Sequence, residues 1–333
     1  MTASFLVCPV CGSSRVQLFA HARDVEYYTS ATTFNYQQCA ECRSVFLESP
    51  PVDQLRVIYP PNYYSYRSTM GSDSLLERIK ASLDSRLFKK LIRKIPGNSL
   101  NVLDVGGGSG WLLTLIRNTS DRVKQTHEVD LDEGARSAAE AVGHVFHSCR
   151  IEEFSSSEKF DLILMLNLIE HVSDPKAVLR AMSHLLAPGG LILIKTPNVD
   201  TLDCRLFRNH NWGGFHCPRH FVLFNRQSLI DLARHCGLQT TSISYTQGAP
   251  QWGCSILGWF GLKGWIGVSS ERPLYTHWLY PVVCAFAAAF DLLRSPFMRT
   301  AQMFAVLQLE NTETRPHSRI ICSVPLVNIA ISR

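Results

Sequence analysis

The sequence predicts an α/β protein with a doubly wound, largely parallel sheet and a small metal-binding module in front of it. Two observations support this fold class: strand-like and helix-like segments alternate from residue 100 to residue 246, and two cysteine pairs precede residue 50. Such alternation is typical of a parallel sheet with helices on both faces. We therefore expect ligands to bind outside the carboxyl ends of the strands.

The alternating segments are defined by apolar runs and by apolar residues at helical spacing. Strands are expected at 100–105, 123–129, 144–149, 160–167, 190–196, 238–246 and 302–309. Helices are expected at 110–119, 132–142, 174–187 and 226–236. With 333 residues, of which 46% are apolar, the chain is long enough for one sizeable catalytic domain and an accessory module.

Charge and cysteine content restrict the classes of partner and compartment. A net charge of +5 allows a negatively charged small acceptor but gives no reason to expect a nucleic acid. The first residues lack the basic start and long apolar run of a secretion signal, and eleven cysteines are present. An odd number of cysteines without an export signal favours reduced thiols and metal ligation, so we expect a cytoplasmic protein.

Residues 1–50 have the cysteine spacing of a zinc ribbon. Cys8 and Cys11 form one Cys-x-x-Cys knuckle, and Cys39 and Cys42 form a second, with an insert of strand-like alternation between them. Four thiolates complete a tetrahedral zinc site and leave no position for water or substrate. The pattern therefore predicts a structural zinc ion, on which the folding of so small a module depends.

Residues 51–98 are expected to connect this module to the catalytic domain. Their first part is rich in proline and tyrosine and is predicted to be a linker. The segment 78–95 then combines apolar residues at helical spacing with many lysines and arginines, which predicts a basic amphipathic helix. A solvated outer face is the favoured interpretation of these charges, and contact with an anionic membrane or acidic substrate is the alternative.

A glycine-rich turn follows the first strand of the catalytic segment. Asp104 is followed by Gly106, Gly108 and Gly110, and a helical pattern begins at once. Glycines without a Cβ let the backbone pass close to a ligand. A dinucleotide fingerprint needs a third glycine where this chain has Trp111 or Leu113, and a phosphate loop needs Gly-Lys-Ser/Thr, which is lacking.

The charge of Asp104 indicates which cofactor this turn binds. A carboxylate at the end of the strand repels a pyrophosphate but attracts an ammonium or sulfonium group. S-adenosylmethionine (SAM) carries both cations. The sequence therefore predicts SAM as the cofactor.

These motifs resemble those of class I SAM-dependent methyltransferases. Asp104, Gly106, Gly108 and Gly110 match the family's first motif, which binds the methionine part, and Asp130 matches the acid that binds the ribose hydroxyls. The resemblance implies a Rossmann-like seven-stranded sheet with an antiparallel last strand, within residues 99–310. It covers roughly residues 100–245.

The family's third landmark is a strand followed by a Glu-His pair and an Asp-Pro helix start. Here Asn167 ends the strand, Glu170 and His171 follow, and the helix begins at Asp174-Pro175. By this resemblance Asn167 is a candidate cofactor contact.

The loop after the fifth strand resembles the acceptor loop of small-molecule methyltransferases. It contains Trp212, His216 and His220, with His220 at the family's histidine position and Trp212 as a candidate substrate contact. A hydroxyl or carbon acceptor needs a base, and histidine titrates near neutral pH. Our order of preference for the base is His220, His171, then His216. A second metal bound by His216, Cys217 and His220 is a less favoured alternative.

Three further segments are interpreted more broadly. In the resembling enzymes a tyrosine-bearing segment covers the cofactor, so Tyr63 and Tyr64 are candidate lid residues; docking on the surface is the alternative. The hydrophobic insertion 247–300 is expected to cap the acceptor pocket, with membrane contact through 252–293 as the minority interpretation. Residues 311–333 form a tail without a recognisable signature.

The function expected from this resemblance is methyl transfer from SAM to a hydroxyl, or a carbon, of a small molecule. A sugar, a glycan precursor or a quinone-like metabolite is the expected acceptor, and a nucleic acid is not. The alternatives are an RNA methyltransferase with the zinc ribbon as docking module and a non-catalytic SAM-binding protein. The expected location is cytoplasmic, with peripheral contact at the inner face of the membrane as a variant. The oligomeric state stays open.

Overall fold

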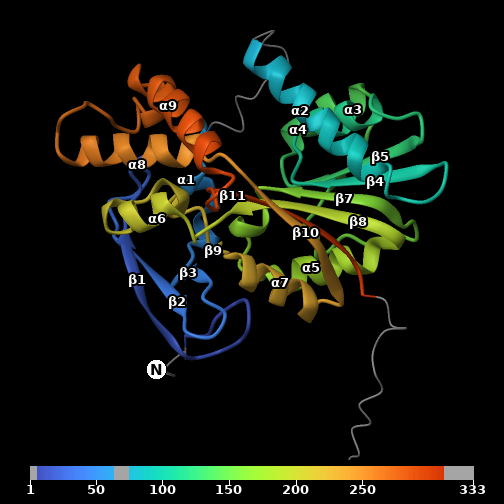
Figure 1. The fold of residues 1–333 in the computed structure, drawn as a ribbon, viewed down its shortest axis with the longest axis horizontal. Coiled ribbons are helices and arrows are strands. Elements are labelled where there is room, and N and C mark those ends of the chain that lie inside the picture. The colour runs from blue at the N-terminus through green and yellow to red at the C-terminus, as the bar shows by residue number, and fades with distance from the viewer. Residues whose placement is uncertain (1–5, 64–74, 311–333) are drawn as a thin grey trace, which may run out of the picture.

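The chain forms a seven-stranded sheet flanked by helices, as the alternation predicts (Figure 1). The computed structural model describes residues 6–63 and 75–310. The strands of this sheet lie in the order β10-β11-β8-β7-β4-β5-β6. Their bounds are β4 Leu100–Val105, β5 Val123–Asp130, β6 Val145–Ser148, β7 Phe160–Leu166, β8 Leu186–Pro197, β10 Leu238–Thr246 and β11 Gln302–Leu309. Strand β11 runs antiparallel to both neighbours, which confirms the predicted last strand.

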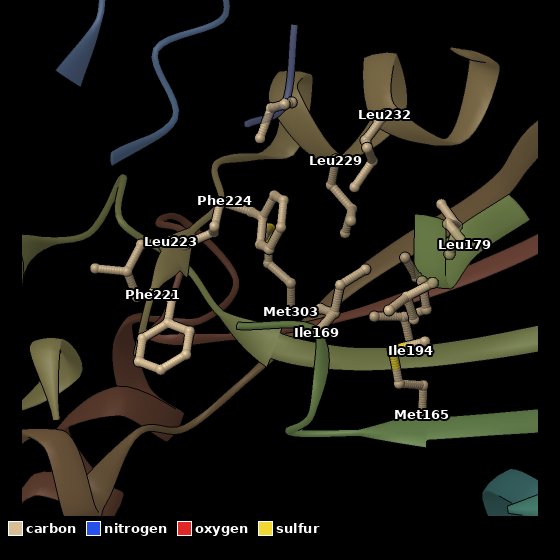
Figure 2. Close-up of a cluster of buried hydrophobic side chains, with 14 of the residues drawn as sticks. Met165, Ile169, Leu179, Ile194, Phe221, Leu223, Phe224, Leu229, Leu232 and Met303 are labelled. Carbon is tan, nitrogen blue, oxygen red and sulfur yellow. The ribbon is translucent and has the colours of Figure 1, made fainter. Parts of the chain in front are cut away.

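The helices begin where local capping signals place them. Asp174 accepts a hydrogen bond from the Ala177 amide and is followed by Pro175, and Asn225 forms a capping box with Ser228. The helices on the two faces of the sheet are α2 Leu75–Ile92, α3 Trp111–Arg117, α4 Glu133–Ala141, α5 Pro175–Leu185 and α7 Arg226–His235. Two apolar clusters fill the space between helices and sheet, and Figure 2 shows part of the larger one around Met165, Ile194 and Met303.

A second, four-stranded sheet joins the cysteine-containing segment to the large domain. Its strands are β1 Val16–Ala22, β2 Phe34–Cys39, β3 Val45–Leu47 and β9 Val222–Leu223, in that order. Strand β9 belongs to the acceptor loop and pairs with β3 through Val45 and Phe46. The small module and the acceptor loop therefore share one sheet, which the spacing of cysteines alone does not reveal.

Residues 51–98 differ in two respects from the expected linker and amphipathic helix. A short 3₁₀ turn, η1 Val52–Gln54, and a one-turn helix, α1 Leu55–Ile58, occur within the proline-rich part. The buried apolar residues of α2, among them Phe88 and Leu91, lie in its C-terminal half, and Lys80 lies over the Trp111 ring of α3. Ile79 and Leu83 are about half exposed, at 48% and 56%, so the apolar face continues past the domain surface.

The insertion 247–300 folds into two packed helices, α8 Ala249–Leu262 and α9 Leu279–Arg294, joined through the 3₁₀ turn η6 Leu274–Thr276. Buried Asp291 connects them, because it accepts hydrogen bonds from the Gly248 amide and the Trp252 indole. The outer face of α9 exposes large apolar side chains, among them Phe286 at 75% and Leu293 at 78%. Within residues 6–63 and 75–310, every helix is too short or too polar to cross a bilayer.

Candidate active site

The glycine turn lies at the carboxyl end of β4, between that strand and α3. Gly106, Gly108 and Gly110 all have positive φ, at +77°, +64° and +72°, which favours glycine. Gly107 is required for a different reason. A Cβ there would lie 2.2 Å from Oδ2 of Asp104 and 2.7 Å from Oε2 of Glu128. The turn therefore leaves no room for a side chain above the two carboxyl groups.

Three acidic side chains surround this turn. Asp104 and Glu128 are buried, and Asp130 ends β5. Glu128 accepts a hydrogen bond from the Gly107 amide at 2.6 Å, and Asp130 accepts one from the Gly108 amide at 3.0 Å. These bonds fix the turn to the neighbouring strand.

The free carboxylate oxygens suit a cationic ligand. Oδ2 of Asp104 and Oε2 of Glu128 are buried and have no hydrogen-bond partner among the described residues. Burial and the charge of Asp130 raise the pKa of Asp104 to about 7, and burial with the charge of Asp104 raises the pKa of Glu128 strongly. Because these two oxygens have no hydrogen-bond partner within the described part of the chain, the site fits the ammonium and sulfonium charges of SAM.

Asn167 lies beside this turn, at the end of the adjacent strand β7. It is exposed and adopts a positive φ of +56°, and its amide donates to the Lys195 carbonyl at 2.8 Å. The next residue, Leu168, approaches the position of a Gly106 Cβ to 3.1 Å. The segment that leads to Glu170 and His171 is therefore in contact with the glycine turn.

The three histidines predicted as candidate bases come together. The ring centroids of His171 and His220 are 4.6 Å apart, those of His216 and His220 are 5.0 Å apart, and those of His171 and His216 are 6.2 Å apart. His171 belongs to the 3₁₀ turn η3 Ile169–His171 after β7, and the other two belong to the loop before β9. Residues almost fifty positions apart thus form one cluster.

Carbonyl groups fix the tautomers of two of these rings. Nδ1 of His220 donates to the Gly214 carbonyl at 2.8 Å, and Nδ1 of His171 donates to the Arg219 carbonyl at 3.0 Å, because a carbonyl only accepts. Burial lowers the pKa of His220 well below its ordinary value and the pKa of His171 to about 3. Both rings are therefore neutral near pH 7, with Nε2 as the basic nitrogen.

Glu170 lies fully buried next to this cluster. Its Oε2 accepts a hydrogen bond from the Thr196 hydroxyl at 2.9 Å, and its Oε1 has no partner among the described residues. Burial raises the pKa of Glu170 to about 7. Glu170, His171 and His220 each offer an atom within 4.8 Å of the others, so they also form a candidate metal site. Of the predicted set His216, Cys217 and His220, only His220 belongs to this group; His216 and Cys217 do not.

Two tyrosines from the segment before α2 reach the histidines. The Tyr59 hydroxyl lies 2.8 Å from Nδ1 of His171, and the Tyr63 hydroxyl lies 3.2 Å from Nε2 of His216. Tyr63 is 5% exposed, and its ring centroid lies 5.8 Å from that of His216, so its ring packs against the cluster. Tyr64, the second candidate lid residue, lies outside the described residues.

Trp212 is a buried residue of the acceptor loop. It is 1% exposed, and its indole donates to Asp203 at 2.7 Å. The amide of Gly213 donates to the Ser255 hydroxyl of α8 at 2.8 Å, so the insertion packs against the same loop. The burial of Trp212 favours a role in shaping the loop.

Several residues of the site carry no sequence signal that identified them beforehand. Asp24 and Arg219 form an ion pair at 3.0 Å with both side chains fully buried, and Glu26 lies 2.9 Å from Nδ1 of His216. Glu128 lies two positions before Asp130 in the same strand, and this spacing is a sequence feature that points to a third acid beside the glycine turn. Asp24, Glu26 and Arg219 cannot be identified from the sequence, because their roles arise from contacts between segments almost two hundred positions apart.

The four cysteines of the small module converge as predicted. Sγ of Cys8 lies 3.6 Å from Sγ of Cys42, and Sγ of Cys11 lies 3.5 Å from Sγ of Cys39. All four sulfur atoms lie within 4.8 Å of one another. Tetrahedral zinc with four thiolates at about 2.3 Å requires sulfur atoms about 3.8 Å apart. The residues therefore fit a zinc ion.

Comparison with known proteins agrees with the geometry of the site. The model of the methyltransferase domain family matches residues 75–243. The chain belongs to this family and is a SAM-dependent methyltransferase. This result confirms the enzyme class expected from the glycine turn and its acids.

Curated relatives from several bacteria are similar to about half of this chain. The chain is 33% identical over 183 residues to the ubiquinone biosynthesis O-methyltransferase of Cereibacter sphaeroides (strain ATCC 17025), which covers 50% of this chain and 69% of the relative. It is 32% identical over 179 residues to the protein of the same name from Bradyrhizobium sp. (strain ORS 278), covering 47% and 67%.

Among solved structures, the chain is similar to the 1,6-didemethyltoxoflavin-N1-methyltransferase of Burkholderia thailandensis. The sequence identity is 16%, the alignment covers 86% of this chain and 99% of that chain, and the TM-score is 0.48.

Proposed function

We propose that this enzyme transfers the methyl group of SAM to a hydroxyl oxygen of a small molecule, with His220 as the base. The observation that carries the proposal is the cluster of His171, His216 and His220 beside the segment that touches the glycine turn. A cofactor-binding turn and a group of neutral imidazoles in one place supply the two parts that hydroxyl methylation needs.

When bound, SAM supplies a methyl group already activated by its sulfonium. The chain's own task is to align the acceptor oxygen about 3 Å from that carbon and to remove its proton. In this mechanism Nε2 of His220 accepts the hydroxyl proton while the oxygen–carbon bond forms and the carbon–sulfur bond breaks. Nδ1 of His220 donates its proton to the Gly214 carbonyl. This hydrogen bond fixes the orientation of the imidazole and leaves Nε2 as the nitrogen that accepts a proton. His171 is the second choice, since its tautomer is fixed in the same way.

His216 is the third choice for the base. Its Nδ1 lies 2.9 Å from Glu26 and its Nε2 lies 3.2 Å from the Tyr63 hydroxyl, so both nitrogens already have protein partners. This arrangement favours an orienting role.

For the acceptor we favour a phenolic or quinone-like metabolite. The relatives named as ubiquinone biosynthesis O-methyltransferases support this choice, and a sugar or glycan precursor is the second candidate. Tyr59 and Tyr63 support it further, because rings at the site suit a flat, partly apolar acceptor. A carbon acceptor and an RNA acceptor are less favoured alternatives.

The remaining assignments are part of the same proposal. Residues 1–50 are a zinc ribbon with a structural zinc ion, 51–98 connect it, and 99–310 are the methyltransferase domain with the insertion 247–300 as a cap. Asp104 and the glycine turn hold the methionine part of SAM, Asp130 holds the ribose and Asn167 borders the cofactor. The protein acts in the cytoplasm, and the exposed face of α9 is where peripheral membrane contact would occur.

Replacement of His220 by glutamine tests the base. We expect kcat to fall by about a hundredfold, because general base catalysis contributes about that much or more. Binding of S-adenosylhomocysteine, measured by calorimetry, should be unchanged. His210→Gln, an exposed change in the same loop, is the matched control and should retain activity. A loss smaller than about tenfold in a folded His220→Gln protein would refute the role of His220, and a large loss in His171→Gln would then transfer it to that residue.

A further inference from the structure

Glu26 is a carboxylate that the small N-terminal module brings to the histidine cluster. It lies in the connection between β1 and β2, between the two cysteine knuckles in sequence. Its Oε2 is 2.9 Å from Nδ1 of His216, and the two side chains are 12% and 7% exposed. The contact joins positions 190 residues apart, so it exists only in the folded, two-module protein.

A buried ion pair holds the Glu26 segment in place. Asp24 accepts hydrogen bonds from the amides of Tyr27 and Thr29, both at 2.9 Å, and pairs with Arg219 at 3.0 Å. Arg219 also donates to the Ile58 carbonyl at 2.5 Å and lies over the Tyr27 ring at 4.5 Å. Removing one partner of a buried ion pair lowers stability strongly. We therefore expect the Asp24–Arg219 pair to keep the Glu26 segment in this position.

The chemistry of a carboxylate restricts what His216 can do. An ionised carboxylate only accepts hydrogen bonds, so Nδ1 of His216 must carry a proton in this contact. Nε2 is then directed to the Tyr63 hydroxyl at 3.2 Å. The hydrogen-bonded groups are therefore a carboxylate, an imidazole and the phenol of Tyr63, whose ring packs against His216.

We infer that Glu26 is a positioning residue of the acceptor site: it holds His216 in the form with a protonated Nδ1, and His216 in turn orients Tyr63 over the acceptor. The inference rests on the proposed function, since it assigns Tyr63 to the acceptor side of that site. It gives the N-terminal module an indirect part in catalysis, through His216 and Tyr63. Glu26 itself touches neither substrate nor cofactor.

The test compares Glu26→Ala with Glu26→Gln in the full-length protein. Alanine removes the acceptor for the Nδ1 proton, whereas glutamine keeps an acceptor oxygen of the same reach. We expect kcat to fall about tenfold or more in Glu26→Ala and to recover most of that loss in Glu26→Gln. Affinity for S-adenosylhomocysteine should change less than twofold in both. Glu48→Gln, an acid of the same module that pairs with Gln37, is the matched control and should behave as wild type.

Nitrogen NMR of the histidine rings provides a readout that a loss of packing alone would not change. In the wild-type protein the His216 signals, assigned by comparison with His216→Gln, should show a protonated Nδ1. That pattern should persist in Glu26→Gln and disappear in Glu26→Ala. An unaltered His216 pattern in folded Glu26→Ala, or equal activity of all three proteins, would overturn the inference.

The same measurements separate this inference from the proposed function. If wild-type protein methylates no hydroxyl acceptor, the function fails, while the NMR comparison still decides whether Glu26 sets the state of His216. If hydroxyl methylation occurs and is insensitive to Glu26→Ala, the function stands and the role of Glu26 is refuted.

Discussion

At the scale of single residues, the site combines buried carboxyl groups with buried neutral imidazoles. Asp104 and Glu128 each hold one oxygen near the glycine turn that lacks a hydrogen-bond partner among the residues that the structure describes, and burial keeps His171 and His220 neutral. Each arrangement costs folding free energy in the absence of ligands. Binding of a cationic cofactor would offset this cost for the two carboxyl groups. A hydroxyl group that donates a hydrogen bond to the imidazoles would offset it for the histidines.

The raised pKa of Asp104 makes cofactor affinity depend on pH. The folded pKa of about 7 lies above the ordinary value of 3.8, so the contribution of Asp104 to stability falls as pH rises from about 4 to 7. If Asp104 binds SAM in its ionised form, as proposed, the affinity for SAM should increase about fifteenfold between pH 5.5 and 7. Calorimetric titration of SAM at several pH values measures this increase.

The variant Asp104→Asn is the counterpart in that experiment. It should bind SAM more weakly and lose the pH dependence, whereas the exposed control Asp121→Asn should keep both affinity and slope. An equally steep pH dependence in Asp104→Asn would show that another group is responsible.

At the scale of elements, the turn between β4 and α3 is the least tolerant part of the fold. A side chain at Gly107 would collide with Asp104 and Glu128, and the neighbouring strand cannot move away because its Glu128 binds the turn. Gly107→Ala should therefore lower the free energy of unfolding by about 1–3 kcal/mol and reduce SAM affinity. Denaturant unfolding and calorimetry measure the two effects.

Gly267→Ala provides the matched control for this change. A Cβ at Gly267 meets no atom within 4 Å, so the substitution should leave stability and SAM binding almost unchanged. Similar stability of the Gly107→Ala and Gly267→Ala proteins would contradict the steric account of the turn.

The regular elements were predictable because their signals are local. Periodicity placed all seven strands of the large sheet, and capping residues such as Asp174 marked helix starts. The short helices at 52–58 were missed because proline at positions 50 and 51 suggests irregular structure. Strand β9 was missed because two residues give no periodicity, and its partner lies near residue 45.

The residues of the candidate site that belong to sequence motifs were predictable from the sequence. Asp104, the glycines and the histidines were found from spacing and family resemblance, and the structure brings the histidines together. Glu26 and Arg219 were not found, because their meaning depends on contacts made only after the two modules pack.

At the scale of the whole molecule, the N-terminal module and the methyltransferase domain share structure at the acceptor loop. Strand β9 extends the module's sheet, and the Tyr36 hydroxyl of β2 donates to the carbonyls of Phe215 and His220, at 3.1 and 3.2 Å. The side-chain amide Nδ2 of Asn225 in the domain donates to the Cys42 carbonyl at 3.1 Å. Order in the cysteine cluster is thereby linked to order around His220.

Metal removal should consequently impair methyl transfer while cofactor binding is retained. If the four cysteines hold the proposed zinc, a chelator that extracts it is expected to lower methyl transfer at least tenfold, because small modules of this kind depend on their metal for folding. Binding of S-adenosylhomocysteine should persist, since the glycine turn packs in the other sheet. Metal analysis and calorimetry before and after zinc is restored provide the measurements. Full activity of metal-free protein would contradict this link.

The central claim, methylation of a hydroxyl at the histidine cluster, is tested most directly by locating the transferred group. The enzyme is given SAM with a ¹³C-labelled methyl group and a panel of phenolic, quinol and sugar acceptors, and the product is examined by NMR. The account predicts a methyl group on oxygen, formed by the wild-type protein and nearly absent with His220→Gln. A methyl group on nitrogen or carbon, formed equally by both proteins, would contradict it.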